Sequence, residues 1–114
     1  MDIKIIQDPI TKKELREMAK AWYGDLVKAV VDIEHGTMAL PGEMHVDEEQ
    51  VLLLQGSRQE NLWGINLHPD EDEEHFIEFD SMINIRPRQN NRSRSVEDPA
   101  TREKIKQIVE LLIK

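Results

Sequence analysis

An arginine-rich segment near the carboxyl end has the most distinctive chemistry in the sequence. Residues 86–95 (RPRQNNRSRS) contain Arg86, Arg88, Arg92 and Arg94, with Asn91 between them and no acidic residue. Guanidinium groups bind carboxylates and phosphates through paired donors, and asparagine and loop N–H groups add neutral donors. The segment therefore predicts a loop that binds a small anionic ligand or an acidic protein partner without catalysis.

The distribution of charge offers two alternatives to an external ligand. Residues 43–80 carry a net charge of −11 and residues 81–114 a net charge of +4, and five consecutive acids occupy positions 70–74. The arginines could pair with acids of their own chain. They could equally meet the acidic stretch of a second copy, which would make the protein a homo-oligomer.

A second group of candidate residues lies between positions 32 and 47. Asp32, Glu43 and His45 offer oxygen and imidazole ligands for a metal ion, or groups for acid–base catalysis. A small metal-dependent or acid–base enzyme is therefore the alternative function. The signal is weak, because no established metal motif such as H-E-x-x-H is present and acids on an outer strand face or at a helix start need no ligand.

Composition excludes several classes of function. The chain has 114 residues, no cysteine and a net charge of −8, which excludes thiolate sites and argues against non-specific binding to nucleic acid. No aromatic residue lies in the arginine segment to stack a base. No glycine-rich phosphate loop or G-x-S-x-G serine is found, so no cofactor is expected and no catalytic residue can be named. Without a signal peptide or an apolar run of roughly 20 residues, a cytoplasmic protein is expected.

Three helices are expected from capping signals and apolar periodicity. Thr11 and Glu14 form a capping box, and Asp47 opens a similar pattern. Asp98 followed by proline is typical of an N-cap with proline at the first helical position. We expect helices at about 12–23, from Asp47 to Leu54, and from Pro99 through Leu112.

Strands are expected where apolar residues alternate with polar ones. The ranges are 3–5, 27–33, 37–40, 61–67 and 76–86, the last with a bend near Asp80 because eleven residues exceed the usual strand length. The short connections favour a mostly antiparallel sheet of four to five strands with three helices, in the order α-β-β-α-β-β-α. The expected fold is a single α+β domain over residues 1–114.

Three stretches of the sequence form distinctive motifs: 56–67 (GSRQENLWGINL), 79–87 (FDSMINIRP) and 91–94 (NRSR). Together they resemble a known family of short prokaryotic proteins that is catalogued only as a domain of unknown function. The resemblance covers nearly the whole chain and implies a prokaryotic, stand-alone domain. It implies no catalytic residue.

Overall fold

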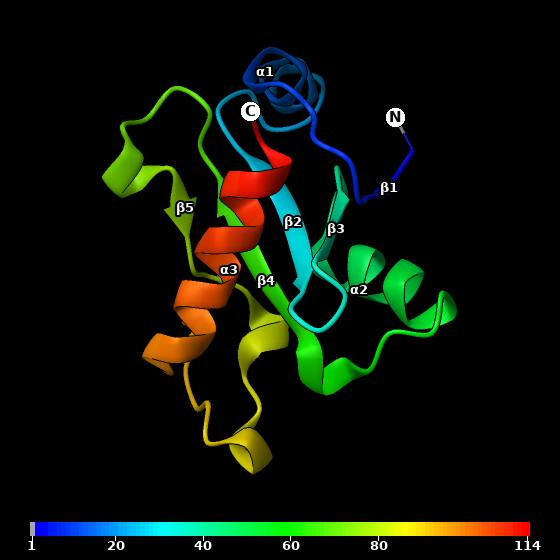
Figure 1. Ribbon diagram of the computed structural model, residues 1–114, viewed down its shortest axis with the longest axis vertical. Coiled ribbons are helices and arrows are strands. Elements are labelled where there is room, and N and C mark those ends of the chain that lie inside the picture. Colours follow the sequence, from blue (N-terminus) through cyan, green and yellow to red (C-terminus); the bar gives the residue numbers. More distant parts are fainter. Residues whose placement is uncertain (1) are drawn as a thin grey trace.

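The computed structural model describes residues 2–114 as a five-stranded antiparallel sheet with helices on both faces (Figure 1). The strand order is β1-β3-β2-β4-β5, so the α+β prediction is confirmed. The strands are β1 (Lys4–Ile6), β2 (Val27–Asp32), β3 (Thr37–Leu40), β4 (Leu62–Leu67) and β5 (Ile77–Glu78), and the helices are α1 (Lys12–Ala21), α2 (His45–Leu54) and α3 (Pro99–Leu112).

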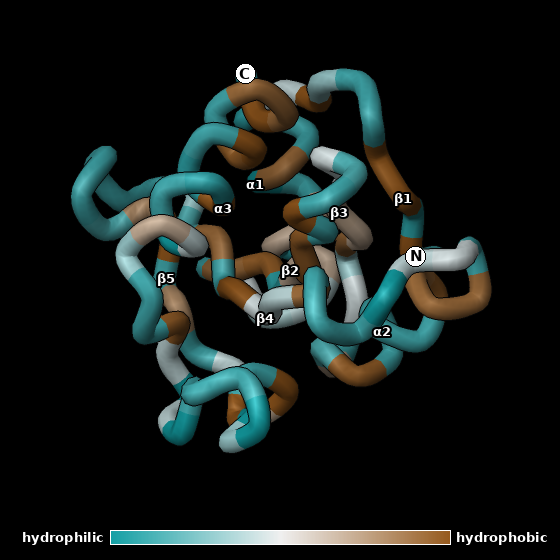
Figure 2. Tube along the Cα trace, turned by 60° about the horizontal axis from the view of Figure 1, so that its bottom comes forward, coloured by the Kyte–Doolittle hydropathy of each residue, from teal (hydrophilic) through white to brown (hydrophobic). Residues whose placement is uncertain are grey.

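Two apolar clusters lie on opposite faces of the sheet. The larger joins α1 and α3 to β2, β3 and β4, through residues such as Leu15, Ile65 and Ile105. The smaller lies under α2 and contains Val30, Ala39, Leu52 and Leu62. Figure 2 shows these apolar segments gathered in the middle of the molecule, with hydrophilic loops around them. Strands β2 and β4 are therefore buried on both faces.

Two of the three predicted helix starts are correct. Thr11 Oγ1 accepts the Glu14 N–H at 3.0 Å, and Asp98 accepts the Thr101 N–H at 3.2 Å. The start predicted at Asp47 is wrong, because α2 begins at His45 and its N-cap, Met44, makes no side-chain hydrogen bond. The imidazole of His45 bonds the carbonyl of Ile65 in β4 at 2.8 Å, and this long-range contact was not visible in the sequence.

The long strand predicted at 76–86 is also wrong beyond its first residues. β5 covers only Ile77 and Glu78, and the chain then forms short 3-10 turns at Met82–Asn84 and Pro87–Gln89. Ser81 starts the first turn by accepting the Ile83 N–H at 3.3 Å. This local bond competes with strand pairing.

No helix in residues 2–114 is long and apolar enough to cross a membrane.

Candidate functional site

The arginine segment is attached to the edge of β4 that β5 leaves uncovered. β5 pairs with β4 only at Asn66 and Leu67. Farther along that edge, the side-chain amide of Asn84 accepts the Gly64 N–H at 2.9 Å and donates to the Gly64 carbonyl at 3.0 Å. The amide of Asn84 thus takes the place of a peptide group in the missing strand.

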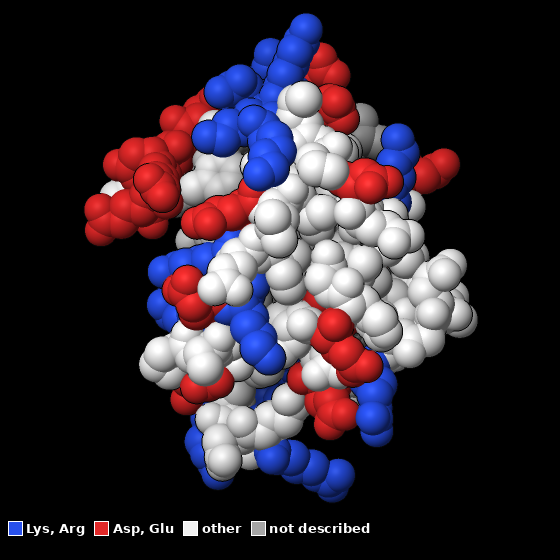
Figure 3. Space-filling view, in the orientation of Figure 1, with Lys and Arg blue, Asp and Glu red and all other residues white. Residues whose placement is uncertain are grey.

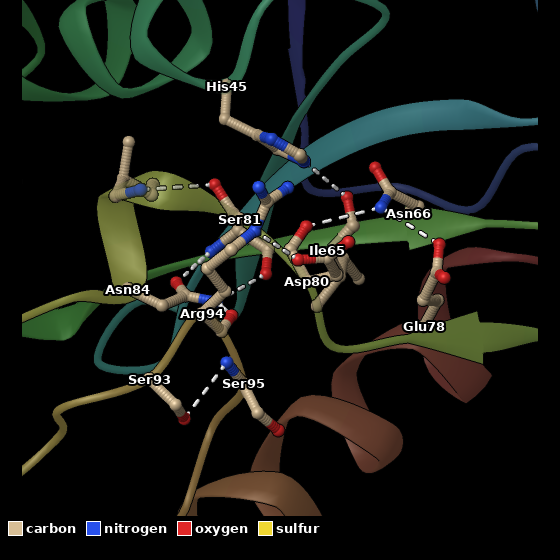
Figure 4. Close-up of polar contacts among 12 residues, drawn as sticks. His45, Ile65, Asn66, Glu78, Asp80, Ser81, Asn84, Ser93, Arg94 and Ser95 are labelled. Atoms are coloured by element: carbon tan, nitrogen blue, oxygen red, sulfur yellow. Dashed lines mark hydrogen bonds and ion pairs between the residues drawn. The ribbon is translucent and has the colours of Figure 1, made fainter.

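Gly64 permits this attachment because it has no side chain. A Cβ at this position would lie 2.5 Å from the Cβ of Ser81 and 3.2 Å from Cδ2 of His45. Both distances are shorter than an ordinary van der Waals contact, so the turn at Ser81 can approach the strand only at a glycine. Figure 4 shows Ser81, Asn84 and Arg94 meeting on this side of β4.

Asn91 fixes the loop from inside. Its side chain is only 3 % exposed and donates to the carbonyls of Asn84 and Ser95, both at 2.7 Å, and of Ser93 at 3.2 Å. Its amide oxygen accepts the Glu97 N–H at 2.8 Å. Asn91, predicted as a binding residue, therefore has its amide fully used within the loop.

Backbone N–H groups of the loop point together to form an anion-binding nest, and the chain fills this nest with its own carboxylate. Glu97 accepts the backbone N–H groups of Arg92 and Ser93, each at 2.9 Å, and the Ser93 hydroxyl at 2.8 Å. The hydrogen bond from the Ser93 hydroxyl, followed by those from the two N–H groups, lowers the pKa of Glu97. The loop is therefore held in one conformation by both Asn91 and Glu97.

Two of the four arginines are engaged within the chain. The guanidinium of Arg86 lies 4.1 Å from the ring centre of Trp63 and donates to the carbonyls of Gln59 and Leu62. Burial lowers the pKa of Arg86, although an arginine remains charged at physiological pH. Nε of Arg94 bonds Oδ1 of Asp80 at 2.6 Å in an exposed ion pair.

The other two arginines, Arg88 and Arg92, form no ion pair within residues 2–114, although Arg92 is near enough to Glu97 for its charge to contribute to the lowered pKa of that carboxyl. Both are exposed, and no carboxylate within residues 2–114 lies within 4.0 Å of either guanidinium. The side chains make no hydrogen bond to another described residue. Contacts within the chain therefore engage two of the four arginines that were predicted to bind a ligand. The other two remain as cations on a rigid loop.

A cavity of about 470 Å³ lies beside the loop. It is bounded by Trp63, Gln89 and Asn90 and also by two acidic residues, Glu60 and Glu97. Asp98 adds a third acid to its wall. A small anion in this cavity would be repelled, so the cavity does not extend the arginine site.

The structure does not bring the predicted metal ligands together. Asp32 is paired with Leu62 on β4, whereas His45 bonds Ile65, three residues or roughly 10 Å farther along that strand. Within residues 2–114 no group of three or more histidine or acidic side chains is arranged to hold a metal ion. Asp32, Glu43 and His45 therefore do not form one site.

Asp32 is instead joined to His35 and Ser57. Its Oδ2 accepts from Nδ1 of His35 at 2.7 Å and from the Ser57 hydroxyl at 2.6 Å. Burial acts to raise the pKa of Asp32, but the bonds from Ser57 and His35 outweigh it and lower that pKa. Asp72 and His75 repeat the same 2.7 Å contact on an open surface, so the Asp-x-x-His arrangement is mainly a turn-forming feature of this chain.

Glu48 is an ionisable residue whose burial the sequence did not reveal. It is fully buried, and among residues 2–114 neither carboxylate oxygen has a partner with good hydrogen-bond geometry, although the nearby backbone N–H of Gly42 acts to lower its pKa. Burial raises the pKa of Glu48 to about 10, and burial also lowers the pKa of the neighbouring His45. Its place one helical turn before the buried Leu52 was the only signal available in the sequence.

The comparisons with known proteins identify a family and nothing more specific. Searches of curated proteins and of solved structures found no match to this chain. A family model described as a protein of unknown function, DUF5674, matches residues 4–112. Because the match spans nearly all of its 114 residues, the chain belongs to the DUF5674 family.

Proposed function

We propose that this protein is a non-catalytic binding module that holds an acidic segment of a protein partner through Arg88 and Arg92. The observation that carries the proposal is that both guanidinium groups are exposed and lack a carboxylate partner among residues 2–114. In a chain with 23 acidic and 15 basic residues, two unpaired arginines on one loop are available to an external anion.

The rigidity of the loop supports binding. Asn91 and Glu97 together fix its backbone, so Arg88 and Arg92 project from a prearranged base. A loop that is already ordered loses less conformational entropy when a partner binds. Arg86 and Arg94 contribute by anchoring the two ends of the loop.

An acidic protein segment fits this surface better than a small anion. The N–H nest that could hold a phosphate is occupied by Glu97, and the adjacent cavity is lined by Glu60, Glu97 and Asp98. What remains is two exposed guanidinium groups, each free to pair with one carboxylate. Successive carboxylates along an acidic peptide meet that requirement.

A fluorescein-labelled octapeptide of glutamate tests the proposal by fluorescence anisotropy. We expect weak binding at low salt that disappears at about 0.5 M NaCl, where surface charges are screened. The double variant Arg88→Ala/Arg92→Ala should weaken binding at least about tenfold. The double variant Arg16→Ala/Arg58→Ala removes the same charge from two exposed, ion-paired arginines and should leave binding unchanged.

Other outcomes would reject the proposal. Equal loss of binding in both double variants would mean that the peptide responds only to net charge. Stronger competition from inorganic phosphate than from unlabelled peptide would favour a small anion. Sedimentation that shows a dimer dissociated by Arg88→Ala/Arg92→Ala would instead make the acidic turn at 70–74 of a second copy the partner.

A further inference from the structure

A groove with an apolar floor lies between α3 and the β5 edge of the sheet. It has a volume of about 610 Å³ and runs between α3, the first turn of α1 and the segment that leads into β5. Its floor is formed by Phe76, Ile77, Phe79, Val109 and Ile113. The volume lies within the range of about 300–1,000 Å³ that is usual for ligand pockets.

The two rims of the groove carry opposite charges. Glu71, Glu73 and Glu74 come from the acidic turn, whereas the two helices contribute Lys12, Arg102 and Lys106 together with one acid, Glu110. In Figure 3 the acidic turn forms a red protrusion at the left edge, with blue side chains of the neighbouring helices beside it. Arg16 of α1 pairs with Asp70 at the start of the acidic turn at 3.0 Å, but within residues 2–114 no ion pair within 4.0 Å involves a charged residue that lines the groove.

Cationic side chains already lie over the aromatic part of the floor. Nζ of Lys12 is 5.4 Å from the ring centre of Phe76, and the guanidinium carbon of Arg102 is 4.6 Å from that of Phe79. Arg102 is held there by the Val96 carbonyl and the Ser95 hydroxyl. Arg102 is therefore fixed at the edge of the apolar surface.

Backbone groups are also available at this groove. β5 is the last strand of the sheet and pairs on one side only, with β4. An edge strand can accept an extended peptide as an additional strand. Ile77 of β5 belongs to the floor of the groove, so a peptide beside β5 would place side chains over that floor.

We propose that this groove binds an extended peptide segment of another protein, with apolar side chains on the floor, a basic residue at the acidic rim and an acidic residue at the basic rim. Unpaired charges of both signs across an apolar floor match a segment that supplies both opposite charges. The volume accommodates two or three apolar side chains. This site is separate from the arginine loop, and neither proposal depends on the other.

The test uses a blocked, fluorescein-labelled pentapeptide of lysine, leucine, threonine, valine and glutamate, in that order. We expect binding by the full chain that weakens at least about tenfold when leucine and valine are replaced by serine, because the buried apolar area is lost. Lys106→Glu should weaken binding roughly fivefold by reversing one rim charge. Backbone NMR shifts on binding should fall at residues 71–79 and 102–113.

Lys104→Glu is the matched control. Lys104 is exposed on the same helix and does not line the groove, so this variant should bind like the wild type. Equal loss in Lys104→Glu and Lys106→Glu, equal binding of the serine peptide, or no binding at about 1 mM peptide would overturn the proposal. So would free leucine binding as tightly as the peptide, or a dimer that Lys106→Glu dissociates.

Discussion

Glu48 is an ionisable group that the fold encloses without an ion-pair partner among residues 2–114, and the backbone N–H of Gly42 only partly offsets its burial. Its Cγ would lie 2.6 Å from a Cβ at Gly42, so only a glycine there leaves room for the glutamate side chain. Burial raises the pKa of Glu48 to about 10, whereas its ordinary value is 4.5. The folded protein therefore keeps this carboxyl protonated at neutral pH, while the unfolded chain releases the proton.

Replacing Glu48 with glutamine should stabilise the protein, and the gain should increase with pH. Above pH 4.5 the unfolded chain binds fewer protons at this position than the folded chain, so the wild type loses stability as pH rises towards 10. Each pH unit in that window costs about 1.4 kcal/mol, which amounts to about 3 kcal/mol at pH 7. Urea denaturation of wild type and Glu48→Gln at pH 5, 6, 7 and 8 measures the difference.

Glu103→Gln provides the control for this series. Glu103 is exposed on α3, and its replacement should change the free energy of unfolding by less than about 0.5 kcal/mol. A Glu48→Gln variant whose stability relative to wild type is the same at pH 5 and pH 8 would show that Glu48 is not held protonated by the fold.

The sequence predicted which residue types gather in the loop, but it did not predict which of these residues contact the rest of the chain. The sequence indicated that the arginines would gather on one loop, but it could not distinguish Arg86, which stacks on Trp63, from Arg88, which is free. Asn91 was expected to face a ligand and is instead buried. These differences depend on contacts between residues far apart in the chain, which spacing does not encode.

Elements with strong local signals were predicted well. The helices that begin after Thr11 and Asp98 follow their caps, and the hairpin of β2 and β3 follows its alternating pattern. The prediction of a strand through residue 86 failed because Ile83 and Ile85 alternate in sequence but lie in and after a 3-10 turn. The amide of Asn84, and not a strand, completes the edge of β4.

Asn84→Ala should destabilise the protein by about 3 kcal/mol. The change leaves the N–H and carbonyl of Gly64 without partners in a buried setting, and each unpaired buried group costs about 1–3 kcal/mol. It also removes the bond to the Arg94 carbonyl at 3.0 Å. Chemical denaturation at neutral pH gives the free energy of unfolding.

Asn61→Ala removes a comparable amide in an open position. Its side chain bonds the exposed carboxylate of Glu34, so its loss should cost well under 1 kcal/mol. If Asn84→Ala were no more destabilising than Asn61→Ala, the polar groups of Gly64 would have to be satisfied without Asn84, and the strand-replacing role of this amide would be wrong.

At the scale of the whole molecule, the two faces of the sheet are unequally covered. Eighteen buried residues form the cluster shared with α1 and α3, whereas four form the cluster under α2. α2 also lacks a side-chain N-cap and carries the protonated Glu48. The helix with the smaller apolar contact and an uncompensated carboxyl should open before the rest of the domain.

Native-state hydrogen exchange measured by NMR tests this order of opening. Amides of β2 and β4 should exchange only through global unfolding, since both faces of these strands are buried, and amides of α2 should exchange at a lower free energy. Opening of α2 exposes Glu48 to water, where its pKa returns towards 4.5. After correction for the intrinsic exchange rate, raising the pH from about 7.5 to 9, a range above the ordinary pKa of 6.5 for His45 on the same helix, should therefore favour opening of α2 more than opening of α3.

The variant Glu48→Gln tests separately the two causes of early α2 opening, which are the titration of Glu48 and the small apolar contact of the helix. In this variant α2 should still open before β2 and β4, because the cluster of Val30, Ala39, Leu52 and Leu62 is unchanged, but the pH dependence of its opening should be lost. Exchange of α2 and α3 at one common free energy in the wild type would contradict the argument, since the domain would then open as a single unit. Retention of the pH dependence in Glu48→Gln would show that Glu48 is not the group that titrates when α2 opens.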